Sequence, residues 1–175
     1  MEKRIVIMGY MGSGKSTIAQ KLSKLTSKKM VDLDSFIEEK EGQTISQLFK
    51  SKGEIYFRKI ERMYLKKLLD DTSITILSLG GGTPCYGDHL KLIKNTENLV
   101  SVYLSASLKE LTERLFSETH IRPLISHLET KEKLEDFIRK HLFERAFYYN
   151  QADLVVQTDQ KTIEEVVEEI KKALF

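Results

Sequence analysis

The feature that most constrains this chain is the glycine-rich stretch Gly9–Thr17. It matches the pattern G-x-x-x-x-G-K-[ST], in which backbone N–H groups of a loop cradle phosphates. The apolar, β-branched run Arg4–Met8 precedes it, and Ile18–Leu25 then spaces apolar residues for one helix face. A glycine loop between a strand and a helix lets an anion approach closely, and the helix N-terminus attracts that anion. The stretch therefore predicts a nucleotide site.

The residue types in this loop suit a bound nucleotide. Lys15 is expected to reach the β- and γ-phosphates, and the Ser16 hydroxyl is expected to bind Mg²⁺ directly. The alternative is a Gly-rich turn with an exposed lysine, but the flanking strand and helix patterns favour nucleotide binding. The residues predicted to contact the nucleotide here are Gly12, Ser13, Gly14, Lys15, Ser16 and Thr17.

Five short apolar runs rich in β-favouring residues alternate with helical patterns. These runs are Arg4–Met8, Met30–Leu33, Ile74–Leu79, Leu99–Leu104 and Leu154–Gln157. The alternation predicts one α/β domain with a parallel sheet and crossover helices. Ligands of such sheets bind beyond the carboxyl ends of the strands, where the conspicuous loops of this chain fall.

Several helix starts carry capping signals, in which a Ser or Thr and a Glu or Gln three residues later satisfy unpaired N–H groups. The candidate pairs are Ser35 with Glu38, Thr44 with Gln47, and Ser107 with Glu110. The last helix is expected over Thr162–Leu174, with its apolar residues on one core-facing side. The polar segment Phe116–Lys133 is the best candidate for a mobile lid.

The composition limits the kinds of partner. A net charge of +2 predicts no broad nucleic-acid or membrane surface, so any charge for an anionic ligand must be local. Cys85 is the single cysteine and the four histidines lack metal-ligand spacing, so we read the histidines as surface or packing residues. No apolar run is as long as a membrane span and no signal segment precedes the first strand, which predicts a cytoplasmic protein.

Two carboxylates, Asp32 and Asp34, follow the second apolar run. We expect both side chains at the strand end to lie on the same side, because strand periodicity is two. One could hold Mg²⁺ through water, and the other could accept a proton from a substrate hydroxyl. Alternatively, Asp34 helps to cap the next helix, although Ser35 already offers a cap, which favours the functional role.

The stretch Gly53–Glu61 contains an arginine suited to bind an anion. Arg58 and Glu61 lie three residues apart on a predicted helix, so Glu61 can orient the guanidinium. An oriented Arg presents a planar fork to a carboxylate or phosphate, and Phe57 could add an apolar wall. The alternative is an exposed ion pair that contributes little energy.

Three later features could also contact a ligand. Gly80–Gly82 could bring a backbone N–H to a ligand where side chains would block it. Arg122 in the lid could neutralise charge on a transferring phosphoryl group, and Arg145 could be a second anion clamp. Either arginine could instead be a solvated surface charge. The third apolar run lacks the terminal Asp of motor ATPases, and the order of residues in Asn150–Asp153 disfavours a GTPase.

These motifs together resemble the shikimate kinase family over nearly the whole chain. The motifs that carry the resemblance are, in order, Gly9–Thr17, Asp32-x-Asp34, Gly-Glu-x-x-Phe-Arg-x-x-Glu from Gly53 to Glu61, Gly80–Gly82, Arg122-Pro-Leu, and Arg145 followed by Tyr149. The resemblance implies a P-loop NTPase fold like that of nucleoside-monophosphate kinases, a parallel five-stranded sheet of order 2-3-1-4-5 flanked by helices. It implies one domain over residues 1–175, with a substrate-binding segment at about 34–62 and a mobile lid at about 116–133.

The resemblance also implies a reaction: Mg²⁺-dependent transfer of the γ-phosphate of ATP to the 3-hydroxyl of shikimate, in aromatic amino acid biosynthesis. The positions that match shikimate-binding residues are Asp34, Phe49, Phe57, Arg58, Glu61, Gly80, Gly81, Gly82 and Arg145. The two arginines would grip the carboxylate of shikimate. Arg114 matches a position beside the adenine, and Lys15 and Arg122 match the charges on the transferring phosphate.

Further roles come from the same match. Lys15, Asp34 and Arg122 are the expected catalytic residues, with Asp34 as a candidate general base. Ser16 is the direct Mg²⁺ ligand and Asp32 binds the ion through water. The resemblance implies ATP and shikimate as the partners of a monomer that binds neither nucleic acid nor membrane.

The chain departs from the family pattern in two places, and two other functions compete with this reading. The interval from Arg122 to Arg145 looks longer than usual, and Gln157–Asp159 lacks the common first Asp. A gluconate kinase on the same fold would not need both Arg58 and Arg145. A regulatory nucleotide-binding module without catalysis would be free to lose Lys15 and the other catalytic residues.

Overall fold

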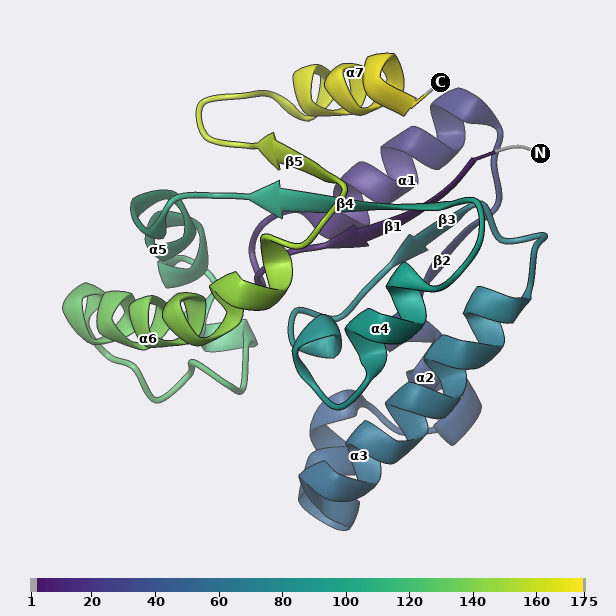
Figure 1. Cartoon of the computed structure of the whole chain (residues 1–175). Helices are drawn as coiled ribbons and strands as arrows, with labels where there is room; N and C mark the ends of the chain where they lie inside the picture. The colour runs from purple at the N-terminus through teal and green to yellow at the C-terminus, as the bar shows by residue number, and fades with distance from the viewer. Residues whose placement is uncertain (1–2, 175) are drawn as a thin grey trace.

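The molecule is built on a parallel sheet of five strands, seen edge-on in Figure 1 in a computed structural model that describes residues 3–174. The strands are β1 (Arg4–Met8), β2 (Met30–Asp32), β3 (Ile76–Ser78), β4 (Leu99–Ser105) and β5 (Leu154–Gln157). Their order is β2-β3-β1-β4-β5, which confirms the predicted topology. The central strand β1 pairs with β3 and β4, so that Val6 lies between Leu77 and Ser101.

Seven helices cover the two faces of the sheet in the part of the chain that the structure describes. They are α1 (Lys15–Thr26), α2 (Leu33–Glu41), α3 (Ile45–Asp70), α4 (His89–Lys94), α5 (Leu108–Phe116), α6 (Lys131–Tyr149) and α7 (Ile163–Leu174). Helices α1 and α7 lie together on one face, and the others lie on the opposite face or beside it (Figure 1). Short 3₁₀ turns at Thr83–Cys85 and Thr119–Ile121 complete the order.

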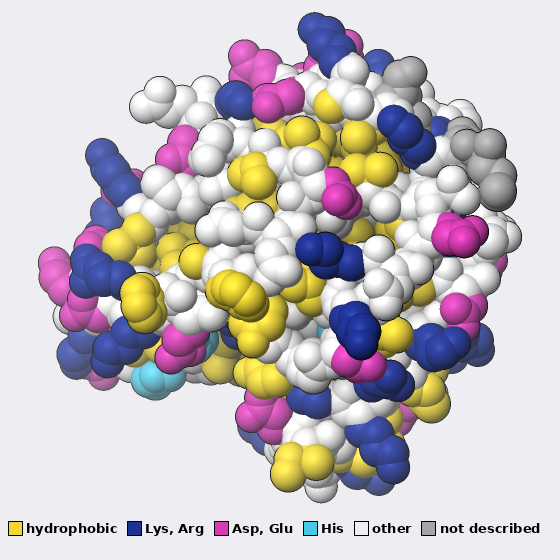
Figure 2. Space-filling view, in the orientation of Figure 1, with side chains coloured by type: hydrophobic (Ala, Val, Ile, Leu, Met, Phe, Trp, Pro, Cys, Tyr) yellow, Lys and Arg dark blue, Asp and Glu magenta, His cyan; other side chains and the backbone are white. Residues whose placement is uncertain are grey.

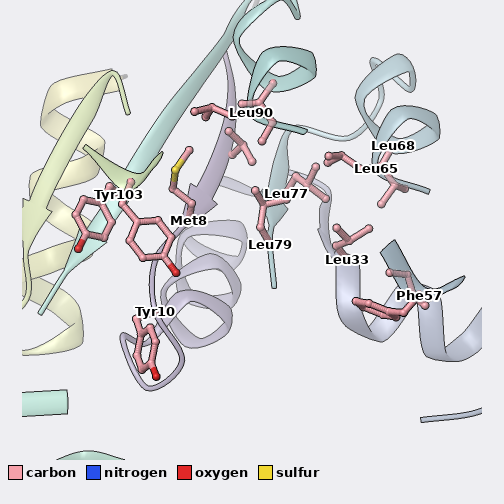
Figure 3. Packing of buried hydrophobic residues seen from close by; sticks show 14 of the residues in the cluster. Met8, Tyr10, Leu33, Phe57, Leu65, Leu68, Leu77, Leu79, Leu90 and Tyr103 are labelled. Carbon is pink, nitrogen blue, oxygen red and sulfur yellow. The ribbon is translucent and has the colours of Figure 1, made fainter. Parts of the chain in front are cut away.

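The alternation of side chains along β1 divides the core into two clusters. Ile5 and Ile7 pack with residues of α1 and α7, whereas Val6 and Met8 pack with the larger cluster on the opposite face. Figure 3 shows Met8 in this larger cluster, with Leu77 on the neighbouring strand β3 and Phe57 further out on α3. A strand buried on both faces explains why Arg4–Met8 reads as a continuous apolar run after its first residue.

The end of β2 differs from the prediction. The strand stops at Asp32 and α2 begins at Leu33, so the expected strand Met30–Leu33 is one residue too long. The cap of α2 is Asp32, whose Oδ1 accepts from the Ser35 backbone N–H at 3.1 Å. The predicted Ser35–Glu38 capping box is therefore wrong. Because the helix begins at Leu33, three residues before a Ser35 cap would allow, the N–H that needs a cap is that of Ser35, and Asp32 reaches it.

The other helix predictions have mixed outcomes. The Thr44–Gln47 capping box of α3 is confirmed. Ser107 caps α5 by accepting from the Glu110 N–H, but its own N–H donates to Asp159 at 2.9 Å instead of to Glu110. The last helix begins at Ile163, one residue after its expected start, and its first apolar residue is 43% exposed. The third strand is shorter than the predicted Ile74–Leu79.

Helix α3 contains a break that the sequence pattern did not predict. Gly53 has φ 85° and ψ 171°, a backbone conformation open to glycine, and it divides α3 into two helical halves. Arg58 and Glu61 both lie in the second half, which packs on the core through Phe57, Ile60 and Leu65.

The loops at one edge of the sheet bring the predicted motifs together. The Gly9–Thr17 stretch, hereafter the phosphate loop, follows β1, and Asp32 ends β2. Gly80–Gly82, hereafter the glycine strip, follows β3, which lies between these two strands in the sheet. The carboxyl ends of parallel strands meet at one edge, so the three motifs are neighbours in space.

The surface carries mixed charge. On the face shown in Figure 2, Lys and Arg side chains lie among Asp and Glu side chains, so basic charge does not gather in one broad patch there. Among residues 3–174, no helix is long and apolar enough to cross a membrane.

Candidate active site

The phosphate loop wraps around the N-terminus of α1. Helix α1 begins at Lys15, directly after Gly14, whose φ of 91° leaves the N–H groups of the first turn open to the loop. Gly12 has φ 79°, and a Cβ there would meet Leu115 of α5 at 3.0 Å. Glycine is needed at Gly12 both for its backbone conformation and for its packing. The result is a pre-formed anion site at a helix N-terminus.

Two cavities of about 310 Å³ each flank this loop and share Gly12, Gly14 and Thr17 as a common wall. The first continues over apolar and polar residues between α1, α5 and α7, including Arg114, Thr158 and Ile163. The second is more polar. It is lined by Met11, Gly12, Gly14, Lys15, Ser16, Thr17, Asp32, Asp34, Leu79, Gly80, Gly81, Glu118 and Arg122. One extended molecule could therefore occupy both cavities by crossing the phosphate loop.

Lys15 is buried beneath the loop. Only 9% of it is exposed, and its Nζ donates to the Tyr10 carbonyl at 3.0 Å. Burial lowers the pKa of Lys15 to about 8, although the nearby Asp34 and Asp32 carboxylates act in the opposite direction. An ammonium held here at neutral pH is poised to gain from an anion, because a bound phosphate would restore its lost solvation.

Asp32 and Asp34 both line the second cavity, but for a different reason from the predicted strand alternation. Asp32 ends β2, and Asp34 lies in the first turn of α2. The Ser16 hydroxyl donates to Asp32 Oδ2 at 2.7 Å, which joins the phosphate loop to the end of β2. Burial, reinforced by the neighbouring Asp32 and Glu61 carboxylates, raises the pKa of Asp34 to about 6. A carboxylate with this pKa can take up a proton near neutral pH.

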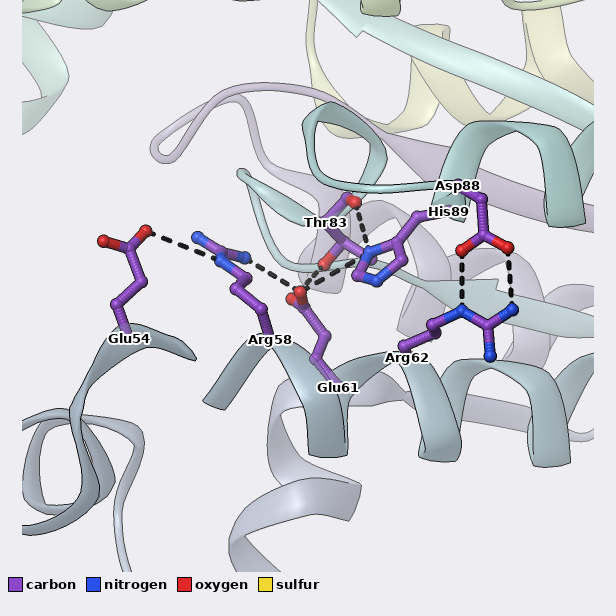
Figure 4. Close-up of polar contacts among 7 residues, drawn as sticks. All are labelled: Glu54, Arg58, Glu61, Arg62, Thr83, Asp88 and His89. Carbon is purple, nitrogen blue, oxygen red and sulfur yellow. Dashed lines mark hydrogen bonds and ion pairs between the residues drawn. The ribbon is translucent and has the colours of Figure 1, made fainter. Parts of the chain in front are cut away.

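Arg58 forms a partly buried ion pair with Glu61, and not the exposed ion pair that was the alternative in the sequence analysis. Its Nη1 lies 2.8 Å from Glu61 Oε2, and Glu61 is only 1% exposed (Figure 4). The guanidinium carbon lies 3.6 Å from the centre of the Tyr86 ring and 5.2 Å from that of Phe57. The guanidinium plane is thus held between an acid and aromatic rings.

The glycine strip is the place where three predicted ligand-binding side chains converge. A Cβ built on Gly80 would lie 2.7 Å from Asp34 Oδ1. A Cβ on Gly81 would lie 3.7 Å from Arg145 Nη1, and one on Gly82 would lie 3.0 Å from Arg58 Nη2. A side chain at Gly80 would collide with Asp34, and one at Gly82 would press on Arg58, whereas a Cβ at Gly81 would crowd the Met11 backbone N–H at 3.2 Å.

Arg145 comes from α6 and is surrounded by phenols. Its guanidinium carbon lies 5.5 Å from the centre of the Tyr10 ring, and it interacts with the Tyr149 hydroxyl. The Tyr149 hydroxyl donates to the Gly81 carbonyl. Tyr10 in turn is hydrogen-bonded to His141 at 2.9 Å, so α6 is tied to both the phosphate loop and the glycine strip.

The remaining predicted residues lie at the borders of the two cavities. Arg114 donates to the Gly12 carbonyl at 3.1 Å and lines the first cavity. Arg122 lines the second cavity and pairs with Glu118 at 2.5 Å. Phe49 packs on Phe57 with a centroid distance of 4.6 Å, behind Arg58. Within the segment predicted as a lid, Ile125 is fully buried and anchors the chain to the larger core cluster.

Sequence reasoning missed several side chains that support the arginines. Thr83, Tyr86 and His89 contact the Arg58–Glu61 pair, and His141 contacts Tyr10. We predicted that the histidines are surface or packing residues. His89 is indeed packed in the interior, with 2% of it exposed, but the prediction did not include the polar contacts of His89. The one available signal was the position of Thr83–His89 directly after the glycine strip.

Comparisons with known proteins agree with this arrangement. The family model described as shikimate kinase matches residues 11–175. The chain belongs to the shikimate kinase family. It is 48% identical to the shikimate kinase of Flavobacterium johnsoniae over 170 residues, which cover 97% of each chain. Family membership confirms the prediction of an ATP-dependent kinase.

Solved shikimate kinases share the fold of this chain. The crystal structure of the enzyme from Bacteroides thetaiotaomicron superposes with a TM-score of 0.87 at 31% identity and covers 98% of both chains. The shikimate kinase from Acinetobacter baumannii, in complex with shikimate, has a TM-score of 0.86 at 28% identity, over 99% of this chain and 93% of that one.

Proposed function

We propose that this protein transfers the γ-phosphoryl group of ATP to the 3-hydroxyl of shikimate, producing ADP and shikimate 3-phosphate. The observation that carries the proposal is the convergence of Arg58, Arg145 and Asp34 on the glycine strip, beside the phosphate loop. Two cations suit the carboxylate of the acceptor, and an acid of raised pKa suits its hydroxyl. The named relative in complex with shikimate has the same fold over nearly its full length.

On the donor side, the protein contributes position and charge. The N–H groups at residues 12–17 would hold the phosphates, and Arg114 would border the base in the first cavity. Lys15 and Arg122 face the second cavity, where they would neutralise charge on the transferring group. Phosphoryl transfer leaves little covalent chemistry to the protein, so this positioning and charge supply most of the rate enhancement.

The residues present fit Mg²⁺. A hydroxyl and a carboxylate, Ser16 and Asp32, lie 2.7 Å apart on the second cavity, and oxygen atoms are the ligands that Mg²⁺ prefers. We propose that Ser16 holds the ion directly and that Asp32 holds it through water. When bound, the ion would supply positive charge that offsets the negative charge of the phosphates.

On the acceptor side, Arg58 and Arg145 would grip the carboxylate, with Phe49 and Phe57 behind Arg58 as apolar walls. The acceptor hydroxyl oxygen attacks the γ-phosphorus, the bond from that phosphorus to the bridging oxygen of ADP breaks, and the hydroxyl proton passes to Asp34. Because the pKa of Asp34 is about 6, its carboxyl group is mostly ionised at neutral pH in the free enzyme and can accept this proton.

We further propose that residues 1–175 act as one monomeric domain in the cytoplasm, with neither nucleic acid nor membrane as partner. The segment at about 34–62 supplies most of the acceptor contacts, and the segment at about 116–133 carries Arg122. Movement of the second segment over bound ATP would exclude water from the reaction.

A coupled assay of ADP release tests the proposal. The protein is incubated with Mg²⁺ and ATP and with shikimate, gluconate or no acceptor. We expect ADP release to depend on shikimate. Release with gluconate alone would indicate another acceptor on the same fold, and ATP binding without release under any condition would indicate a non-catalytic nucleotide-binding module.

A further inference from the structure

An arginine can grip a carboxylate with both arms of its fork only if its plane is held in place, because the side chain is long and flexible. Arg58 is partly buried, with the buried Glu61 carboxylate at 2.8 Å on one edge and the Tyr86 ring on one face, while the exposed Glu54 carboxylate lies further away, at 3.8 Å from Nε. The orientation of Arg58 therefore depends on what holds Glu61.

A residue of the segment that follows the glycine strip holds Glu61 in place. The Thr83 hydroxyl donates to Glu61 Oε1 at 2.8 Å, while Glu61 Oε2 accepts from Arg58 (Figure 4). Each oxygen of this buried carboxylate thus has its own donor. The Thr83 hydroxyl lies in the same buried layer, since Thr83 is 0% exposed.

His89 completes the group from the first turn of α4. Its Nδ1 lies 2.7 Å from the Thr83 carbonyl and 3.6 Å from Glu61 Oε2. A carbonyl oxygen only accepts, so Nδ1 must carry the hydrogen that this contact needs. His89 therefore fixes the backbone of Thr83 and at the same time presents a positive N–H edge to Glu61. We call Arg58, Glu61, Thr83 and His89 the clamp network.

We infer that Thr83 and His89 are positioning residues for the acceptor carboxylate: they hold Glu61, and through it they aim the Arg58 fork. The inference rests on the proposed function, because it takes the acceptor to be a carboxylate. Neither residue lines the second cavity or the phosphate loop, so both act through Glu61 and not on the reacting atoms. The network also ties Arg58 to the strip that contacts Asp34 and Arg145.

Loss of the Thr83 hydroxyl should mainly weaken binding of the acceptor. Thr83→Val keeps the shape of the side chain but leaves Glu61 Oε1 without its donor in a buried site. We expect KM for shikimate to rise about 10-fold, whereas KM for ATP changes less than about 2-fold. Thr83→Ser restores a hydroxyl and should return KM for shikimate to within about 3-fold of the wild type.

His89 has a matched pair of variants. In His89→Asn the side-chain amide can still donate to the Thr83 carbonyl, whereas His89→Leu cannot. We expect His89→Leu to raise KM for shikimate about 5-fold and His89→Asn to raise it less. Thermal unfolding of each variant identifies any that fails to fold, and Thr83→Ser and His89→Asn then carry the comparison.

The decisive experiment repeats Thr83→Val in an Arg58→Lys background. Lysine has no fork to aim, so the further rise in KM for shikimate should shrink to less than about 2-fold if Thr83 acts through Arg58. An equal rise in both backgrounds, or equal changes in KM for ATP and shikimate, would overturn the inference. A wild-type protein that releases no ADP with shikimate would overturn the proposed function, and the inference with it.

Discussion

Two neighbouring groups of charged side chains lie around the glycine strip, and they are built in opposite ways. In the clamp network, the buried Glu61 pairs with Arg58 at 2.8 Å and also accepts from Thr83. The second group, here called the central cluster, consists of Lys15, Asp34 and Arg145. Within residues 3–174, none of these three side chains has an oppositely charged partner at ion-pair distance.

The difference separates a pre-organised wall from a reactive centre. Charges that are already paired hold their geometry before the substrate arrives, which suits recognition. Unpaired, partly desolvated charges raise the free energy of the free protein, and both Lys15 and Asp34 show this in their shifted pKa values. Substrate binding can lower this free energy by giving the charges partners, so the central cluster is stabilised more by ligands than the clamp network is.

The largest expected contrast is in stability. Arg58→Met leaves the Glu61 carboxylate buried without its cation, so we expect the free energy of unfolding to fall by about 2–4 kcal/mol. Arg145→Met removes an unpaired charge, so we expect a change of less than about 1 kcal/mol, although shikimate turnover is lost. Urea unfolding of both variants at pH 7.5 makes the measurement, and equal losses would contradict the contrast.

A smaller effect separates the fork of Arg58 from its charge. Arg58→Lys keeps a cation beside Glu61 but cannot bind a carboxylate with two parallel hydrogen bonds. We expect KM for shikimate to rise about 10- to 30-fold, while KM for ATP changes less than about 3-fold. Steady-state kinetics with each substrate varied in turn decides the matter. Equal losses for both substrates would mean that Arg58 supports the structure and not the acceptor.

The third prediction concerns the strain on Asp34. Its pKa in the folded protein is about 6, above its ordinary 3.8, so the folded state binds a proton in this interval that the unfolded chain releases. The free energy of unfolding therefore falls as pH rises from about 4 to 6. Asp34→Asn should be more stable than the wild type by about 3 kcal/mol at pH 8, with the difference vanishing below about pH 4.

The same variant tests the catalytic role of Asp34. The pH profile of kcat/KM for the wild type should rise through a pKa of about 6, because the ionised carboxylate accepts the hydroxyl proton. Asp34→Asn should lose this rise together with most of its turnover. Near-wild-type turnover with only weaker shikimate binding would rule out a general base and leave Asp34 as a residue that orients the hydroxyl.

Local patterns predicted the position of the phosphate loop between β1 and α1 well. The spacing of glycine, lysine and serine in Gly9–Thr17 encodes a conformation that depends on adjacent residues, and the structure places it at the start of α1 as expected. The sheet order came from the family resemblance, because short apolar runs do not specify which strands pair. The β2 boundary was wrong because Asp32 and Ser35 compete for the same cap, and packing decides between them.

The clamp network shows where such reasoning stops. Its members come from α3 and from the segment that follows β3, so contacts between residues 22 and 28 positions apart hold it together. Nothing in the sequence around His89 indicates that it contacts Glu61, and no periodicity reveals that the Tyr86 ring lies 3.6 Å from the guanidinium carbon of Arg58. The break at Gly53 was missed for a different reason, since an isolated glycine inside a helical pattern is often tolerated.

The glycine strip has a consequence for inhibitors and resistance. Its wall is peptide backbone, and an inhibitor that contacts this wall touches atoms that no substitution replaces. A side chain at Gly80 would meet Asp34 at 2.7 Å, and one at Gly82 would meet Arg58 at 3.0 Å. Escape by mutation at either position would therefore displace Asp34 or Arg58, the residues that we propose bind the acceptor.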